Sequence, residues 1–164
     1  MKTVYLSLGS NMGDRALNIA KAIEALGARG LRVIRQSSLY ETEPVHARGG
    51  WFVNCVVEAE TEMMPRQLMT ALLAIERSLG RRRTQVSEGA KDSRTIDIDI
   101  LTFGTSVMHG AELDIPHPRM ADRRFVLVPF AEIAPDLKHP VLRRTILQLL
   151  ADTSDHCRVR RFES

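Results

Sequence analysis

The sequence predicts an α+β fold of the ferredoxin-like type, with elements in the split order βαββαβ and helices packed on an antiparallel sheet. Strand-like segments rich in Val, Ile and Leu alternate in this order with two segments of helical periodicity. The chain has 164 residues, 44% of them hydrophobic, and no repeat. This length and composition favour a single domain over residues 1–164 with a substantial hydrophobic core.

The first two elements are a strand and a helix. Residues 3–8 form an apolar, strand-length segment, which the glycines and asparagine of the GSNMGDR sequence interrupt. Either Asn11 or Asp14 can cap the helix that follows. The apolar residues of this helix recur at nearly helical spacing as far as Gly27 and Gly30, where we expect it to end.

Two strands and a second helix come next. Alternating apolar residues over 31–42 predict the second strand, and the Val-rich segment 52–61 predicts the third, with a loop over 44–50 between them. Pro65 is suited to the first position of a helix, and apolar periodicity continues from it to Gly80. These segments complete the first five elements of the predicted order.

The remaining chain contains the fourth strand and shorter elements. Residues 81–93 are polar without apolar periodicity, so we expect a mobile surface loop there, of a length that is usually either functional or disordered. The fourth strand is expected over 95–103. A short strand over 107–113 and short helices over 122–133 and 145–150 are expected after it.

Two acidic residues, Asp97 and Asp99, lie within the fourth predicted strand. Because side chains alternate along a strand, both carboxylates should point to one face, with Ile98 and Ile100 on the other. Two close carboxylates repel each other unless something positive compensates them. A divalent cation with oxygen ligands, a basic side chain such as Arg94, or simple exposure on an edge strand can each explain the pair.

Arginine residues precede this strand and follow it. Arg81, Arg82 and Arg83 can stabilise a helix C-terminus, but they also begin the long loop that leads to the acidic strand. Closure of that loop could bring guanidinium groups over a metal-bound anion, as in phosphoryl transfer without a P-loop. The segment IPHPRMADRRF adds His117 and Arg123 in a rigid loop. The GSNMGD turn matches no nucleotide-binding motif, and helix capping explains it.

Composition narrows the classes of protein. The net charge is +3, and the arginine clusters lack the interleaved aromatic residues of a platform for single-stranded nucleic acid. Cys55 and Cys157 have no metal-like spacing, and we expect no disulfide. The chain shows neither a secretory signal nor a membrane span, so we expect a cytoplasmic protein. An RNA-binding ferredoxin-like module and a regulatory domain that binds a small molecule are the alternatives to an enzyme.

The ordered motifs resemble one known family. They are LSLGSNMGDR, SSLYETEPV, WFVN, ERSLGR, SRTIDIDIL and IPHPRM followed by RRF, and together they span residues 3–137. The chain resembles the 6-hydroxymethyl-7,8-dihydropterin pyrophosphokinases of folate biosynthesis. This resemblance implies a monomeric ferredoxin-like enzyme that uses two Mg²⁺ ions to transfer the β,γ-diphosphate of ATP to the pterin hydroxymethyl group, releasing AMP.

The resemblance also implies roles for residues that match the family motifs. Catalysis would depend on Arg81, Arg94, Asp97 and Asp99, of which the two aspartates would bind Mg²⁺. The residues implied to contact ATP are Glu76, Arg83, Arg94, Ile100, His117 and Arg123. The residues implied to contact the pterin are Thr42, Val45, Phe52, Asn54, Asp97 and Phe125. The chain departs from the family at Ser93, where proline is common, and at Phe52, where tyrosine is frequent.

Overall fold

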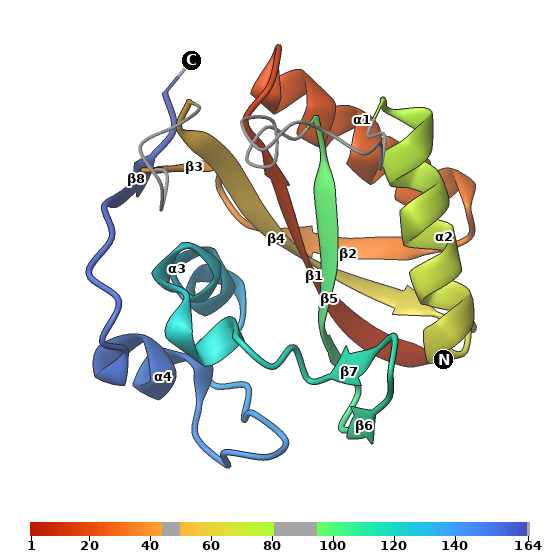
Figure 1. The fold of residues 1–164 in the computed structure, drawn as a ribbon. Helices are drawn as coiled ribbons and strands as arrows, with labels where there is room; N and C mark the ends of the chain where they lie inside the picture. The colour runs from red at the N-terminus through yellow and green to blue at the C-terminus, as the bar shows by residue number, and fades with distance from the viewer. Residues whose placement is uncertain (44–49, 81–94, 164) are drawn as a thin grey trace.

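A computed structural model describes residues 1–43, 50–80 and 95–163. Its main layer is a six-stranded antiparallel sheet in the order β5-β1-β4-β3-β8, with β2 also paired to β4 (Figure 1). A separate two-stranded ribbon contains β6 and β7. The strands are β1 (Lys2–Ser10), β2 (Arg32–Gln36), β3 (Tyr40–Thr42), β4 (Phe52–Thr61), β5 (Asp97–Phe103), β6 (Met108–His109), β7 (Asp114–Ile115) and β8 (Val159–Arg161).

The topology confirms the predicted split arrangement. Helix α1 joins β1 to β2, which are separated in the sheet by β4, and α2 joins β4 to β5, which are separated by β1. The helices are α1 (Arg15–Ala28), α2 (Pro65–Ser78), α3 (Arg124–Ile133) and α4 (Ile146–Asp152). The chain is therefore an α+β protein of ferredoxin-like organisation, with an added strand at its C-terminal end.

Local signals place the ends of the two long helices. The carboxylate of Asp14 accepts a hydrogen bond from the backbone N–H of Leu17 at 3.1 Å, so Asp14 is the cap of α1. Pro65 is the first residue of α2, as predicted. Gly27 lies inside α1 and does not end it; the chain turns at Gly30, whose φ of +96° favours glycine.

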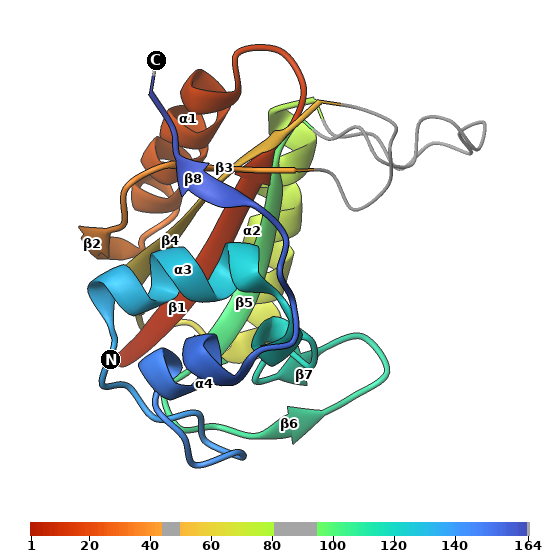
Figure 2. The ribbon, with the colours of Figure 1, turned by 90° about the vertical axis from the view of Figure 1, so that its left-hand side faces the viewer.

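The two faces of the sheet support separate hydrophobic clusters. Leu6 and Leu8 of β1 point toward α1 and α2, whereas Tyr5, immediately before Leu6, points toward α3 and α4. Figure 2 shows α3 crossing the sheet on the side opposite to α1 and α2. The Tyr5 and Phe130 rings, with centroids 5.0 Å apart, fix α3 against this second face. Alternation along β1 thus gives the sheet two covered faces.

Two predicted strands are wrong in detail. The strand expected over 31–42 is divided into β2 and β3 by an extra residue, as in a β-bulge. Gln36 pairs with Val57 and Tyr40 with Asn54, so the chain advances four residues on this side and only three along β4. Ser37 lies at this irregularity, and its hydroxyl accepts the Val56 N–H at 2.9 Å. The strand expected over 107–113 is instead the short β6–β7 ribbon.

The C-terminal strand β8 was not predicted. Val159 is its only apolar residue, so the sequence carries no alternating pattern there. Its position comes from pairing with β3 rather than from burial. The helices expected over 122–133 and 145–150 correspond to α3 and α4, with a 3₁₀ turn before α3.

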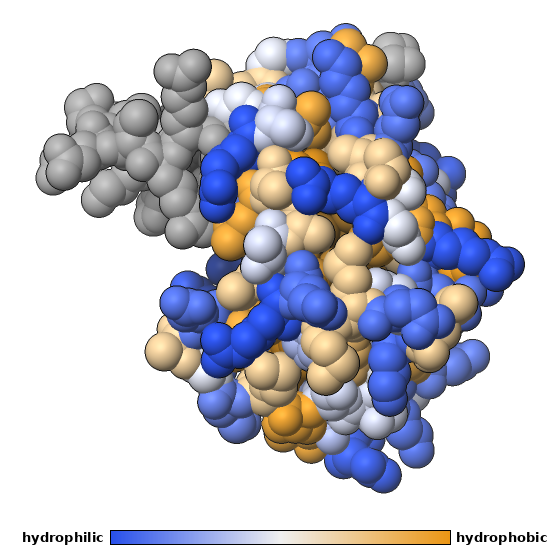
Figure 3. Space-filling model, turned by 90° about the vertical axis from the view of Figure 1, so that its right-hand side faces the viewer, coloured by the Kyte–Doolittle hydropathy of each residue, from blue (hydrophilic) through white to orange (hydrophobic). Residues whose placement is uncertain are grey.

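The outer surface on the α2 side is mixed in character. Figure 3 shows hydrophilic residues interspersed with small apolar areas on this face. Across the described part of the chain, no helix combines the length and apolar character needed to cross a bilayer. Cys55 is fully buried in β4.

One buried histidine makes stability depend on pH. His139 is 5% exposed, and its Nδ1 accepts hydrogen bonds from the N–H groups of Val141 and Leu142 at 3.1 and 3.0 Å. Burial lowers the pKa of His139 below its ordinary value of 6.5. Below pH 6.5, His139 becomes protonated in the unfolded chain more readily than in the folded chain. This difference stabilises the unfolded chain and so lowers the free energy of unfolding.

We therefore expect the free energy of unfolding to fall between pH 7.5 and pH 5.5, with a contribution from His139 of at most about 1.4 kcal/mol per pH unit. Urea unfolding at the two pH values measures this change. His139→Gln does not titrate in this range and should show a shallower pH dependence. Equal slopes for the two proteins would contradict the assignment.

Candidate active site

Asp97 and Asp99 lie on the face of β5 that the strand period predicts. Ile98 and Ile100, each 6% exposed, point into the core against α1 and α2, whereas both aspartates are half-buried and alternate with them. The two carboxylates therefore share the face of the sheet on which α3 packs. The alternation prediction is confirmed.

Cross-strand pairing places three of the site positions in one row. Gly9 of β1 pairs with Asp97 of β5 on one side and with Asn54 of β4 on the other. Ser7 pairs with Asp99 one step along the same face. Because neighbouring strands are separated by about 4.8 Å, the backbones at Asp97 and Asn54 lie roughly 10 Å apart, with Gly9 between them.

Asn54 is held in a fixed orientation over this row. Its side chain is buried, with 4% exposed, and its Nδ2 donates a hydrogen bond to Oγ1 of Thr42 at 2.9 Å. A Cβ atom on Gly9 would lie only 2.6 Å from Oδ1 of Asn54. The carboxamide therefore occupies space that any side chain at position 9 would take.

Gly9 is a site residue that the sequence analysis missed. We interpreted the glycines of the GSNMGD segment as part of a turn, but Gly9 lies within β1. A glycine that interrupts an apolar strand pattern can indicate a close approach, which was the available signal. Its role here is to admit the Asn54 carboxamide.

The two phenylalanines predicted to contact the pterin lie on the same side of the sheet. Phe52 begins β4 and pairs with Thr42, and its ring carbon Cδ1 is 3.7 Å from the position of a Cβ on Gly9. Phe125 is the second residue of α3 and packs against the cluster between α3 and the sheet. The Arg123 guanidinium carbon lies 5.7 Å from the centroid of the Phe125 ring. Both rings are half-buried, so each keeps an accessible portion.

His117 and Arg123 belong to the loop that precedes α3. The backbone N–H of His117 donates to the carbonyl of Leu101 in β5 at 2.8 Å, which fastens this loop beside the acidic strand. Burial, then the positive charge of Arg123, lowers the pKa of His117, while the negative charge of Asp97 opposes the shift. Nδ1 of His117 accepts the Arg119 N–H at 3.1 Å, so a neutral imidazole presents Nε2–H as a donor.

Glu76 lies on α2 and is buried, with 3% exposed. Its carboxylate accepts the backbone N–H of Ile98 at 2.8 Å, between the two aspartates of β5. This bond gives Glu76 a structural role in fixing β5. The side chain of Ile100 is in the core, so its predicted ATP contact would involve its backbone.

Removing the Glu76 carboxylate should destabilise the protein. Glu76→Ala leaves the buried Ile98 N–H without this acceptor, which we expect to lower the free energy of unfolding by about 2 kcal/mol. Glu76→Gln keeps an acceptor oxygen and should lose less. Urea unfolding of the two variants checks this expectation, and equal losses would show that the bond to Ile98 is unimportant.

Four predicted site residues lie outside the described residues. They are Val45, in the segment 44–49, and Arg81, Arg83 and Arg94, in the segment 81–94. The long loop expected over 81–93 falls in the second segment. Their assigned contacts with the pterin and with ATP therefore stay predictions.

The donor groups that are described suit a hard divalent cation. Within residues 1–43, 50–80 and 95–163, no three His, Cys, Asp or Glu side chains gather as a metal site. Asp97 and Asp99 supply two carboxylates on one accessible face. Mg²⁺ in nucleotide-dependent enzymes typically takes one or two carboxylates and completes its shell with phosphate oxygens and water. The pair therefore fits Mg²⁺ bound together with a nucleotide.

Comparison with known proteins gives a consistent result. Residues 5–135 match the family described as 7,8-dihydro-6-hydroxymethylpterin-pyrophosphokinase. The 2-amino-4-hydroxy-6-hydroxymethyldihydropteridine pyrophosphokinase of Methylorubrum extorquens is 43% identical over 139 residues, which cover 84% of this chain and 85% of that protein. The corresponding Aquifex aeolicus enzyme is 37% identical, with 89% of each chain covered.

Larger proteins contain a similar region. The folic acid synthesis protein fol1 of Pneumocystis carinii is 39% identical over 94% of this chain, but the match spans only 20% of fol1. Wild-type HPPK-DHPS of Plasmodium falciparum, in a crystal structure with pteroate, has a TM-score of 0.72 at 17% identity, with 92% of this chain and 44% of that chain covered. This structural likeness shows the shared fold. The extent of the family match and the identity to the bacterial relatives show that the chain belongs to the 7,8-dihydro-6-hydroxymethylpterin-pyrophosphokinase family.

Proposed function

We propose that the chain transfers the β,γ-diphosphate of ATP to the hydroxymethyl group of 6-hydroxymethyl-7,8-dihydropterin and releases AMP, as a Mg²⁺-dependent step of folate biosynthesis. The observation that carries this proposal is the row of Asp97, Gly9 and Asn54 across three strands. In this arrangement, the carboxylates of Asp97 and Asp99, which suit a metal-bound nucleotide, lie beside the Asn54 amide, which can hydrogen-bond to the edge of a heterocycle. The family match and the names of the bacterial relatives support the same reaction.

The pterin would lie on the Asn54 side of the row. Its ring edge carries both donors and acceptors, and the Asn54 carboxamide offers both. With Nδ2 bonded to Thr42, Oδ1 is the part of the amide directed over Gly9. Phe52 and Phe125 would stack on the two faces of the flat ring, and the backbones of Thr42 and Val45 would complete the contacts.

ATP would lie on the Asp97 and Asp99 side. The two carboxylates would hold two Mg²⁺ ions, which would supply positive charge to neutralise the phosphates. Nε2–H of a neutral His117 would donate to a phosphate oxygen, and Arg123 would add a positive charge there. Arg81, Arg83 and Arg94 are proposed as further phosphate contacts, with Glu76 and Ile100 on the nucleotide side.

The chain's own residues would act mainly by orientation. The pterin hydroxyl oxygen would attack the β-phosphorus and release its proton to solvent, the bond from that phosphorus to the α,β-bridging oxygen would break, and AMP would leave with the electron pair. Asp97 is shared by the pterin and ATP subsites. It can accept a hydrogen bond from the attacking hydroxyl and so orient the lone pair of the hydroxyl oxygen toward the β-phosphorus. Rigid β5, fastened at Ile98 by Glu76, would keep this geometry constant.

We further propose that residues 1–164 act as one catalytic domain, as a cytoplasmic monomer whose partners are ATP and the reduced pterin. Nucleic acid is disfavoured as a partner because the accessible face of β5 carries Asp97 and Asp99. A ferredoxin-like RNA-binding module stacks bases on aromatic residues of its sheet and would not place a pair of carboxylates beside the phosphate backbone. The acidic pair on β5 therefore favours a pyrophosphokinase over an RNA-binding module of the same fold.

The proposal is tested by assaying AMP release from ATP with 6-hydroxymethyl-7,8-dihydropterin, with and without Mg²⁺. We expect AMP only when the pterin and Mg²⁺ are both present. A parallel titration with single-stranded RNA should show no binding at physiological salt. RNA binding without pterin-dependent AMP release would refute the enzyme in favour of the RNA-binding module.

A further inference from the structure

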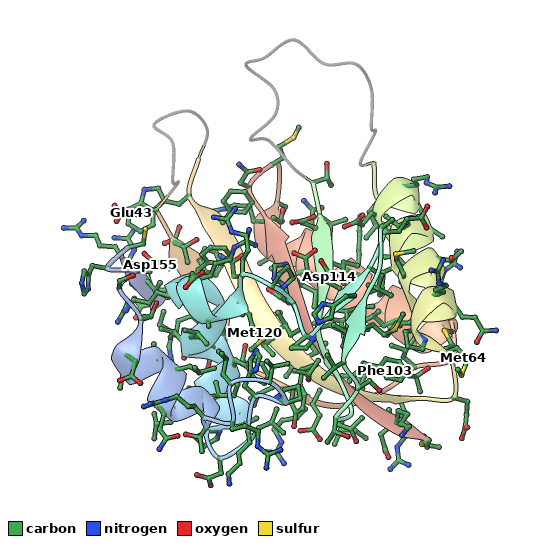
Figure 4. The ribbon with its side chains drawn as sticks, turned by 60° about the horizontal axis from the view of Figure 1, so that its bottom comes forward. Glu43, Met64, Phe103, Asp114, Met120 and Asp155 are labelled. Atoms are coloured by element: carbon green, nitrogen blue, oxygen red, sulfur yellow. The ribbon has the colours of Figure 1, made fainter. Side chains whose placement is uncertain are left out.

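The C-terminal arm, residues 155–162, links two parts of the molecule that are distant in sequence. It runs from the end of α4, past the start of α3, to the free edge of β3, where β8 pairs with it. Figure 4 shows Asp155 and Glu43 on the same side of the molecule, where this arm passes. The backbone N–H of Arg158 donates to the Glu43 carboxylate at 2.9 Å. The arm thus extends the sheet beside Thr42.

One set of contacts joins the arm to the strands that carry Phe52 and Thr42. Arg160 of β8 pairs with Glu41 of β3, and its guanidinium lies 3.3 Å from that carboxylate. The same guanidinium carbon lies 4.3 Å from the centroid of the Trp51 ring, immediately before Phe52. These contacts lie on the α1 face of the sheet, directly behind the proposed pterin face.

Arg15 at the start of α1 completes this cluster. Its Nη2 is 3.1 Å from the second carboxylate oxygen of Glu41, and its Nη1 donates to the Trp51 carbonyl at 2.7 Å. Glu41 is therefore shared by two guanidinium groups, and its side chain is only 16% exposed. A half-buried, multiply bonded network of this kind restrains backbone position more than an isolated surface pair does.

A second set of contacts joins the arm to α3, which carries Phe125. The backbone N–H of Arg124, the residue before Phe125, donates to Oδ2 of Asp155 at 2.8 Å. Nη1 of Arg124 donates to the carbonyl of Cys157 at 3.3 Å. Farther along the arm, the Arg161 guanidinium is 3.7 Å from the carboxylate of Glu132 in α3.

The space between the arm and α3 is not filled by side chains. An open cavity of about 570 Å³ is lined by Arg124 and by residues 156–160. Close packing of side chains therefore does not join the arm to the start of α3 at this point. Polar contacts tie the arm to both sides here: Asp155 accepts from the Arg124 N–H of α3, and Arg160 pairs with Glu41 of β3.

We propose that the C-terminal arm is a positioning element for the pterin, which fixes the separation between Phe52 on one wall and Phe125 on the other. This inference rests on the proposed function, because it assigns the arm to the pterin subsite of that reaction. Arg160 and Asp155 are its two anchoring residues. Neither touches the row of Asp97, Gly9 and Asn54, so the arm should affect pterin affinity and leave ATP binding unchanged.

The test compares Arg160→Ala and Asp155→Ala with the unaltered chain. The dissociation constants of the pterin and of a non-hydrolysable ATP analogue with Mg²⁺ are measured by calorimetry, each in separate titrations. We expect pterin binding to weaken about tenfold in each variant and ATP-analogue binding to change by less than about twofold. Arg160→Lys keeps the charge but loses the guanidinium that lies over the Trp51 ring, and should weaken pterin binding less than Arg160→Ala.

The matched control is Arg32→Ala, which removes the same charge from an exposed pair with Glu60 at the other end of β4. It should leave both affinities unchanged. Unchanged pterin binding in both arm variants, or equal loss for the pterin and the ATP analogue, would overturn the inference. If an alanine variant fails to melt cooperatively, Arg160→Lys decides between these outcomes. Failure of the unaltered chain to bind the pterin would instead refute the proposed function.

Discussion

Asp97→Ala and Asp99→Ala are each expected to lower the rate of AMP release by about a thousandfold or more, because each removes a carboxylate proposed to hold the Mg²⁺ that would neutralise developing phosphate charge. The fold should survive. Both side chains are half-buried on the outer part of a face whose core is formed by other residues, including Leu101. Steady-state assays of AMP release and thermal melting measure the two effects separately.

A second measurement links this loss to metal binding. Binding of an ATP analogue should become less dependent on Mg²⁺ in both variants, as titrations at several Mg²⁺ concentrations will show. Asp152→Ala is the control, because Asp152 lies in α4 and pairs only with Arg144 among the ion pairs of the described chain. Near-normal turnover in either Asp97→Ala or Asp99→Ala would remove the metal assignment.

Gly9→Ala is expected to weaken pterin binding by about tenfold to a hundredfold, although it adds only one methyl group. The new Cβ would lie 2.6 Å from Oδ1 of Asn54, and the bond from Nδ2 to Thr42 restricts how far the carboxamide can retreat. The Asn54 amide would therefore be turned away from the edge of the pterin ring. Calorimetric titration with the pterin measures the change.

Gly27→Ala is the matched control for this substitution. A Cβ at position 27 meets nothing within 4 Å, and the residue lies inside α1. This control should leave pterin binding unchanged and raise the free energy of unfolding by about 0.5 to 1 kcal/mol, since alanine favours a helix more than glycine does. If Gly9→Ala binds the pterin as the unaltered chain does, the close packing of Gly9 and Asn54 has no part in recognition.

Periodicity was sufficient to predict most of the fold and the acidic face. The alternation of Ile98 and Ile100 with Asp97 and Asp99 required only the two-residue period of a strand, and the structure confirms it. The start of α2 at Pro65 also followed from local chemistry, and Asp14, the cap of α1, was one of the two candidates beside Asn11. These features depend on neighbours within a few residues.

The features that the sequence did not predict depend on long-range pairing. The split between β2 and β3 arises because the Ser37 hydroxyl takes the Val56 N–H, a contact between residues 19 positions apart. Strand β8 forms on the β3 edge through Arg160 and its neighbours, without an apolar pattern of its own. The role of Gly9 becomes visible only when Asn54 is placed beside it.

The central claim is that the site transfers two phosphoryl groups together, and analysis of the reaction products tests it most directly. ATP, 6-hydroxymethyl-7,8-dihydropterin and Mg²⁺ are incubated with the protein, and the products are identified by ³¹P NMR and mass spectrometry. We predict equimolar AMP and a pterin that carries a diphosphate. Formation of ADP with a pterin monophosphate, or of ADP and inorganic phosphate without any pterin product, would contradict the account.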